Sequence, residues 1–160
     1  MGVVSNTVEP AASGTPKSLA GRLFGIGQTG ATQGGATGVN LTNPCVNCSI
    51  DVTVGNDAGT VVIQLLDANG NDINYVETVM VVLYTSAART AFAVTGGSTG
   101  LAIGTDGALL ALVAKKVFLV TSESDGDIDF SWTDNATETV ALAVYLPNGN
   151  VVTTAAFANT

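Results

Sequence analysis

Four carboxylates lie close together in the sequence, at Glu123, Asp125, Asp127 and Asp129. Carboxylate oxygens are the ligands that calcium takes in proteins, so this spacing could hold a cation. The order differs from that of an EF-hand loop, which has its glycine after the third acidic position and a bidentate glutamate later. A solvated acidic turn that leads into a strand explains the cluster without an ion. We therefore predict no metal ligand and no raised carboxyl pKa here.

Two of these residues, Asp127 and Asp129, would lie about 7 Å apart on one face of a strand. This separation falls within that of the carboxyl pair in glycoside hydrolases. However, nothing in the sequence around them indicates a cleft. The chain also contains no histidine, which excludes Ser-His-Asp, Cys-His and histidine–zinc chemistry within a single chain. We predict that the protein is not an enzyme and has no catalytic residue.

Two further patterns match cofactor motifs in their letters, Cys45-x-x-Cys48 and a G-x-G-x-x-G stretch at residues 25–30. Two cysteines without histidine complete a four-ligand zinc site only if neighbouring subunits contribute ligands. A local disulfide is conceivable, but a reducing cytoplasm favours two free thiols. The glycine motif binds a dinucleotide only between a strand and a helix, and neither flanks it here. We predict no cofactor.

The composition fits one compact domain with an appendage, since the chain has 160 residues, of which 46% are hydrophobic and 11% charged. A net charge of −8 and a pI near 4.1 would repel phosphate backbones, so we expect no nucleic-acid partner. Mean hydropathy is high, at +0.41, yet no run of about 18 apolar residues exists to span a membrane. The first residues show no secretory signal, and we expect assembly in a cytoplasm.

Residues 1–44 are rich in Gly, Ala, Ser and Thr and hold only three charged residues, Glu9, Lys17 and Arg22. Such a segment buries too little apolar surface to offset the entropy of ordering, which predicts a flexible N-terminal arm. Within it, residues 19–26 form a short apolar hook. We predict that the hook binds a partner; a tail that carries apolar residues by chance is the alternative. The hook residues are Leu19, Leu23, Phe24 and Ile26.

Short runs of Val, Ile, Leu, Thr and aromatic residues alternate with Gly, Asn and Asp clusters beyond the arm, which predicts an all-β domain over residues 45–160. Nine short strands with no helical stretch between them suit a two-sheet β-sandwich, jelly-roll or Ig-like. Asn148-Gly149 indicates a hairpin turn. The predicted strands are 49–54, 60–66, 76–84, 90–94, 109–114, 117–121, 128–132, 139–146 and 151–157.

Alternation along residues 127–133 predicts which face of that strand is buried. Ile128, Phe130 and Trp132 point one way, and the polar residues between them point the other way. Residues 79–84 and 140–146 are apolar on both faces. Strands of this kind either lie centrally in a sandwich or present one face to another subunit.

The pattern of strands and turns resembles the small structural proteins of tailed bacteriophages, of the capsid decoration or cement type. The resemblance spans about residues 50–157 and includes no catalytic motif. The stretches that carry it are VIQLLDANGND at 62–72, VMVVLY at 79–84, LAIGTDGA at 101–108 and AVYLPNGNVV at 143–152.

This resemblance implies a non-enzymatic virion protein on the outer capsid surface that binds the major capsid protein of a phage and stabilises the shell, usually as a homotrimer. It also implies that the apolar hook orders on a neighbouring subunit and that the outer faces of the strands around Val79 and Val144 pack between copies. The alternative is a tail-fibre or receptor-binding adhesion module. Such a module would expose aromatic residues in loops, whereas Phe118, Phe130 and Trp132 fall in predicted strands.

Overall fold

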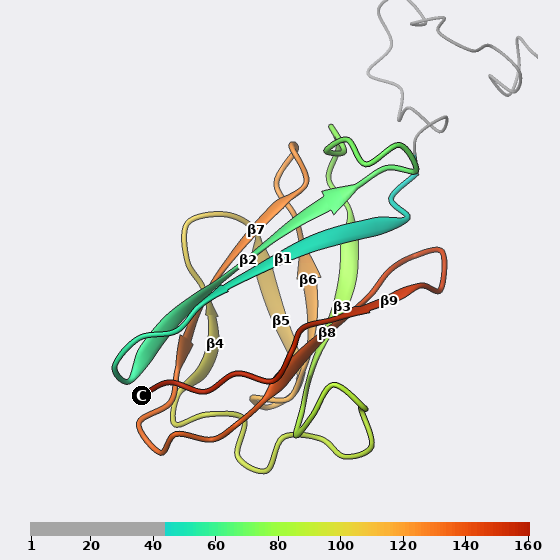
Figure 1. The fold of residues 1–160 in the computed structure, drawn as a ribbon. Helices are drawn as coiled ribbons and strands as arrows, with labels where there is room; N and C mark the ends of the chain where they lie inside the picture. Colours follow the sequence, from blue (N-terminus) through green and yellow to red (C-terminus); the bar gives the residue numbers. More distant parts are fainter. Residues whose placement is uncertain (1–43) are drawn as a thin grey trace, which may run out of the picture. The chain divides into compact units, whose positions relative to one another are not determined.

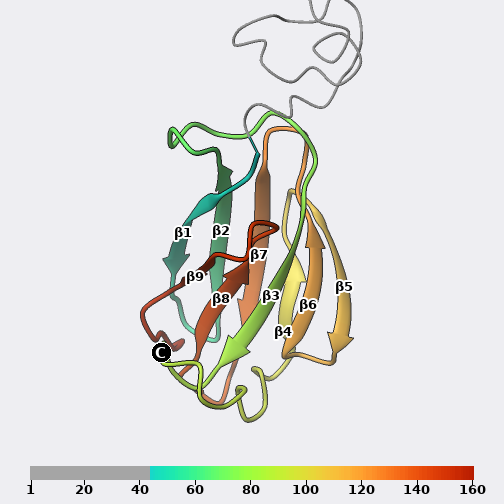
Figure 2. The same cartoon turned by 90° about the vertical axis from the view of Figure 1, so that its right-hand side faces the viewer.

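The computed structural model describes residues 44–160, which form a β-sandwich of two antiparallel sheets (Figures 1 and 2). This confirms the predicted fold class. No helix occurs among these residues, and so none of them belongs to a helix that could cross a membrane. Apart from Pro44, the predicted arm with its hook residues Leu19, Leu23, Phe24 and Ile26 lies outside the described residues.

The strands divide into a four-stranded and a five-stranded sheet. The four-stranded sheet has the order β1-β2-β7-β4, with β1 (Asn47–Thr53), β2 (Ala58–Leu66), β7 (Asp127–Thr133) and β4 (Gly100–Ile103). The five-stranded sheet has the order β5-β6-β3-β8-β9, with β5 (Ala108–Val113), β6 (Val117–Thr121), β3 (Thr78–Tyr84), β8 (Ala141–Tyr145) and β9 (Val151–Thr153). Each central strand therefore pairs with segments that are distant in the sequence.

The core lies between the sheets and follows from the alternation of side chains along the strands. Ile128, Phe130 and Trp132 of β7 are almost fully buried, as the sequence predicts. Leu83 and Val144 of the opposite sheet belong to the same buried cluster. Each such side chain contributes roughly 1.5–3 kcal/mol through its removal from water. The two inner faces together hold the sandwich closed.

One predicted strand is wrong, and one strand was missed. Residues 90–94 form a loop with a single bridge, between Tyr84 and Phe92, and Phe92 and Val94 are exposed. The ninth strand is instead β4, which pairs with β7 through Leu101 and Trp132. Its four residues begin at a glycine with positive φ, so the sequence offers little periodicity. The predicted strand 151–157 ends at Thr153, after which only one bridge continues.

The Glu138 carboxylate explains why the 94–97 segment is not a strand. It accepts N–H hydrogen bonds from Val94 at 2.5 Å, Gly96 at 2.9 Å and Gly97 at 3.1 Å, and one from the Thr95 hydroxyl. These donors would otherwise need a neighbouring strand. Burial alone would raise the pKa of Glu138, but the hydrogen bonds from Thr95, Gly97 and Val94 outweigh it and lower the pKa below its usual value.

We expect Glu138→Gln to destabilise the fold by about 1–3 kcal/mol at pH 7, because an amide accepts fewer and weaker hydrogen bonds than a carboxylate. Because the pKa of Glu138 is lower in the folded protein than in the unfolded chain, its carboxylate stabilises the fold at pH values above the unfolded-state pKa. This stabilisation is lost as the pH falls through the folded-state pKa. The difference between the two proteins will therefore shrink between pH 5 and pH 3. Urea unfolding at pH 7 and pH 3 measures this difference, with Asp72→Asn, at an exposed carboxylate, as control. If the Glu138→Gln protein were as stable as the wild type at pH 7, the Glu138 carboxylate would not stabilise the loop.

Candidate functional site

The two sheets present outer faces of opposite character. On the four-stranded sheet, the outward side chains are mostly polar and include Asp51, Gln64, Asp127 and Asp129. The strands of the five-stranded sheet contain no charged residue at all. An outer face that meets only water normally carries polar and charged side chains. The five-stranded sheet therefore has an outer face suited to a partner.

A continuous row of apolar side chains crosses all five strands of this sheet. The register pairs Leu110 with Leu119, Leu119 with Met80, Met80 with Tyr145, and Tyr145 with Val151. Because cross-strand partners lie on the same face, these five side chains form one stripe. We call the outer side of this sheet the apolar face. It also includes Val82, Tyr84, Val113, Val117 and Ala143.

The side of the apolar face toward β5 is the most exposed. Leu110 is 60% exposed, Val113 51% and Leu119 39%. β5 pairs only with β6, so it is an edge strand. Side chains of this size, contiguous and exposed, are typical of an interaction surface.

Two tyrosines cover the centre of the apolar face. The hydroxyls of Tyr84 on β3 and Tyr145 on β8 lie 2.6 Å apart and form a hydrogen bond. In the register, Val82 and Ala143 lie between them, and both are buried although they point away from the core cluster. Burial and the bond to Tyr145 raise the pKa of Tyr84 to about 12, so the Tyr84 hydroxyl stays protonated at neutral pH. The pair forms a flat, uncharged, pre-ordered patch.

The sequence predicted an apolar outer face here, around Val79 and Val144. The structure confirms that β3 and β8 are apolar on both faces, but Val79 and Val144 themselves point into the core. The outward residues are their neighbours, Met80 and Tyr145. Alternation alone could not decide this, because both faces of each strand have the same apolar character.

The acidic cluster has a different composition from the one that the sequence indicated. Oxygen atoms of Asp106, Asp127 and Asp129 lie within 4.8 Å of one another. Asp106 comes from the loop before β5, which is held near β7 because the Asp129 N–H donates to the Asp106 carbonyl oxygen at 2.9 Å. Glu123 is not a member of this trio; its carboxylate accepts a hydrogen bond from the Gly107 N–H.

The expectation of unperturbed carboxylates is wrong for two members of this trio. Burial raises the pKa of Asp106, and the Asp129 carboxylate raises it further. Burial likewise raises the pKa of Asp127, and repulsion from Asp129 and Asp106 raises it further. The hydrogen bond from the Ile128 N–H lowers this pKa but does not cancel the rise. Three carboxylates are also fewer than the six to eight oxygen ligands of calcium. Repulsion within the trio therefore lowers the stability of the fold at neutral pH. The sequence did not indicate Asp106 as a member, because it is distant along the chain from Asp127 and Asp129.

Both cysteines are buried free thiols at the start of the domain. Burial raises the pKa of Cys45 to about 11, with repulsion from Glu77 adding to the shift, and burial raises that of Cys48 to about 12. The thiolate is the form that reacts or binds metal. Neither thiol is therefore suited to redox or metal chemistry at neutral pH.

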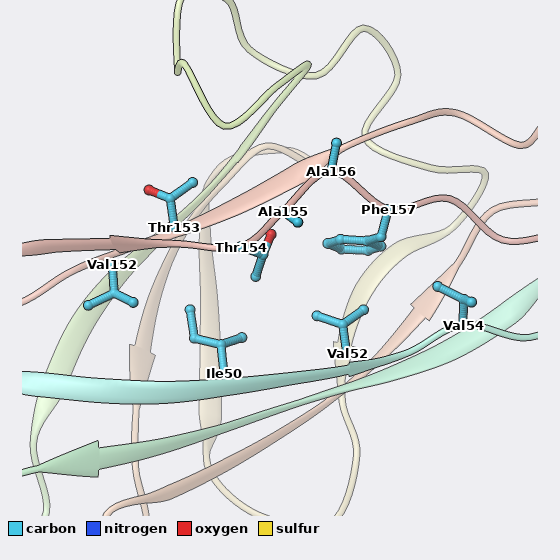
Figure 3. Close-up of a pocket in the computed structure, with 9 residues that line it drawn as sticks. All are labelled: Ile50, Val52, Val54, Val152, Thr153, Thr154, Ala155, Ala156 and Phe157. Atoms are coloured by element: carbon cyan, nitrogen blue, oxygen red, sulfur yellow. The ribbon is translucent and has the colours of Figure 1, made fainter. Parts of the chain in front are cut away.

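A groove of about 370 Å³ lies between the edge strand β1 and the segment that follows β9 (Figure 3). Ile50 and Val52 point into it from β1, opposite Val152 and Phe157. None of the nine residues that line it is titratable. The groove thus offers apolar surface but no acid, base or nucleophile other than threonine hydroxyls.

Comparison with known proteins gives one structural similarity. No family model and no curated protein matches the chain. Among solved structures, the chain is similar to a cohesin module from a family 33 glycoside hydrolase of Clostridium perfringens, with 14% identity and a TM-score of 0.39. The alignment covers 72% of this chain and 94% of the cohesin module. A similarity at this level says nothing about what this chain binds.

The acidic trio generates a prediction about stability. We expect Asp127→Asn to stabilise the fold at pH 7 by roughly 0.2–1 kcal/mol, because it removes one of three repelling charges and the amide oxygen can still accept the Ile128 N–H bond at 2.8 Å. Because the pKa of Asp127 is higher in the folded protein than in the unfolded chain, its charge destabilises the fold at pH values above the folded-state pKa. This destabilisation disappears as the pH falls toward the unfolded-state pKa. The gain will therefore vanish near pH 3.

Thermal and denaturant unfolding at pH 7 and pH 3 measure this gain. Asp51→Asn is the matched control, since Asp51 lies on the same outer sheet face but outside the trio. It should stabilise less. An Asp127→Asn protein that is no more stable than the Asp51→Asn protein would show that repulsion within the trio is negligible.

Proposed function

We propose that this protein is a non-enzymatic structural protein of a virion, a capsid decoration or cement protein that binds and stabilises the major capsid shell of a phage. It acts as a homo-oligomer on the outer capsid surface, with three copies as the resemblance implies, after assembly in the host cytoplasm. The observation that carries the proposal is the apolar face, a sheet surface without charge on any of its five strands.

The distribution of chemistry over the domain supports binding over catalysis. The apolar face and the groove beside β1 are built from aliphatic, aromatic and threonine side chains. The buried thiols are held protonated, and the carboxylate trio lies on the opposite, solvated sheet face. Symmetric repetition on a shell makes modest contacts effective, because each copy is held by several neighbours at once.

The hook residues remain part of this proposal. Leu19, Leu23, Phe24 and Ile26 would bind a neighbouring capsid subunit and leave the sandwich free to contact other copies.

A tail-fibre or receptor-binding module is the second candidate, and one observation favours it. Phe92 is 55% exposed and lies in a loop, where an adhesion module would expose an aromatic ring. That ring is stacked on Tyr84, with centroids 5.6 Å apart, so it also extends the apolar face. The same side chain thus fits both candidates.

Copy number in purified particles tests the proposal and separates the two candidates. Particles produced by the organism that encodes this chain are expected to contain it in a fixed ratio to the major capsid protein, in hundreds of copies or of that order. Shells that lack it are expected to release DNA at a lower temperature. A few copies per particle would support the tail module instead, and absence from particles would overturn both.

A further inference from the structure

The core of the sandwich is incompletely covered at β1. On the neighbouring strand β2, Val61 and Ile63 point inward and are almost fully buried. The register places Val52 and Ile50 of β1 directly opposite them, so these two side chains also point inward. They pack against the same core but are only partly buried. Apolar surface that belongs to the core is therefore open at this edge of the sheet.

The backbone of β1 is unpaired on the same side. The Leu65 N–H of β2 donates to the Gly126 carbonyl oxygen at 3.0 Å, on the side away from β1. Because bonded and non-bonded pairs alternate along antiparallel strands, Ile50 and Val52 point their N–H and C=O groups away from β2. Among residues 44–160, none donates to these groups or accepts from them. β1 is thus a free edge to which a further strand can add.

The opposite wall of the groove is also the edge of a sheet (Figure 3). The Thr154 N–H donates to the Leu142 carbonyl oxygen of β8 at 2.9 Å, so Thr153 points its own N–H and C=O groups away from β8. Val152 and Phe157 line this wall with apolar side chains. The volume of about 370 Å³ has room for about two apolar side chains, since a cavity of about 150 Å³ binds one benzene.

Hydrogen bonds hold both ends of β1 to other segments, so the groove has fixed ends. Before β1, the Val46 carbonyl oxygen accepts bonds from the Asn148 and Asn150 side-chain amides at 3.1 and 3.0 Å. After β1, the Gly55 carbonyl oxygen accepts the Thr160 N–H at 3.1 Å. The groove is therefore formed before any ligand binds, and its apolar walls and free strand edges suit an extended apolar segment.

The chain itself contains a segment of this kind outside the described residues. Five Leu, Ile and Phe residues precede Pro44, and four of them are the hook residues at 19–26. In an extended segment, adjacent residues such as Leu23 and Phe24 point to opposite faces, so either face of the hook brings a large apolar side chain to the groove. The sequence has no proline over residues 17–43, so each residue there has an N–H for strand pairing.

We infer that the hook of a neighbouring copy lies in this groove as an added strand beside β1. The inference rests on the proposed function and deepens it, since it identifies the neighbouring subunit that the hook binds as another copy of this chain. The 17 residues from 27 to 43 span at most about 60 Å. This exceeds the diameter of about 35 Å that a compact domain of this size has. A neighbour's groove is therefore within reach.

The exchange of hooks accounts for three copies. A hook that binds a groove is a heterologous contact, because two different surfaces meet. Three such contacts, each from one copy to the next, close into a ring that uses every hook and every groove. None of the residues that line the groove is titratable, so the contact brings no charge of the acidic domain into the interface.

Charge substitutions in the hook test this inference. Sedimentation equilibrium of the full chain at micromolar concentration is expected to show a trimer. Leu23→Glu/Phe24→Glu places a charge on both faces of the hook and is expected to give a monomer, because a charge in an apolar groove has no partner. Val3→Glu/Val4→Glu is the matched control, an adjacent apolar pair outside the hook, and it should remain a trimer.

A substitution in the groove tests the other side of the contact. Val54 lines the groove but is 45% exposed, so Val54→Glu should fold normally, which thermal unfolding verifies. This variant is also expected to be a monomer. Val62→Glu is its matched control, since Val62 is 37% exposed on the outer face of β2, and it should remain a trimer.

Mixing the hook variant with the groove variant distinguishes exchange between copies from a hook that fills its own groove. The Val54→Glu protein keeps an intact hook, and the Leu23→Glu/Phe24→Glu protein keeps an intact groove. The mixture is therefore expected to form a one-to-one dimer, although each variant alone is a monomer. A hook that filled its own groove would give a monomeric wild type and a mixture that does not associate.

Amide hydrogen exchange tests whether the hook adds as a strand. The N–H groups of Ile50 and Val52 are expected to exchange about tenfold or more slowly in the wild type than in the hook variant. The Asp51 N–H, which faces Val62 of β2, is the internal control and should exchange equally in both.

A monomeric wild type, a trimeric hook or groove variant, a mixture that does not associate, or equal exchange at Ile50 and Val52 would overturn the inference. A control variant that dissociates would also overturn it, because added charge alone would then break the assembly. These outcomes leave the copy number in particles unchanged, on which the proposed capsid role depends. Absence from particles would overturn that role while leaving the exchange of hooks intact.

Discussion

A β-strand has two faces, and only one of them can reach the core of a two-layer sandwich. The outer face of each sheet must therefore meet either water or another molecule. In the four-stranded sheet this face carries Asp51, Asp127 and Asp129 and is suited to water. In the five-stranded sheet, the central strands β3 and β8 are apolar on both faces. The proposed role in assembly depends on this difference between the two outer faces.

The placement of charge follows the same division. Charged side chains flank the five-stranded sheet at its ends and leave its strands neutral. Where carboxylates gather, as at Asp106, Asp127 and Asp129, they lie on the solvated side and raise one another's pKa, which costs stability. The Glu138 carboxylate, in contrast, accepts hydrogen bonds from backbone N–H groups of an irregular loop. Neither group of carboxylates lines the groove beside β1.

Much of the fold follows from local pattern. Alternation along residues 127–133 identifies the buried face of β7, and Asn148-Gly149 identifies the β8–β9 hairpin, in which the Gly149 N–H donates to the Leu146 carbonyl oxygen at 3.0 Å. The residues after Ala93 could not be predicted as a loop, because the Glu138 carboxylate that accepts the Val94 N–H lies more than 40 residues away. β4 was missed because four residues are too few to show a period.

The site was predictable only in part, for the same reason. Strands that are apolar on both faces indicate an apolar outer surface. The row from Leu110 to Val151, however, exists only because the sheet order places β5, β6, β3, β8 and β9 side by side. Asp106 joins Asp127 and Asp129 through a loop-to-strand hydrogen bond that no spacing in the sequence reveals.

The most direct measurement compares the solvent exposure of two methyl-bearing side chains in the intact protein. Leu119 on the apolar face and Val62 on the solvated face are exposed almost equally in a single copy, at 39% and 37%. Methyl relaxation by a soluble paramagnetic agent, recorded at high protein concentration, reports their exposure in solution. If the apolar face is covered, the Leu119 methyls will relax much more slowly than those of Val62. Equal relaxation of both would contradict the claim that this face binds a partner copy.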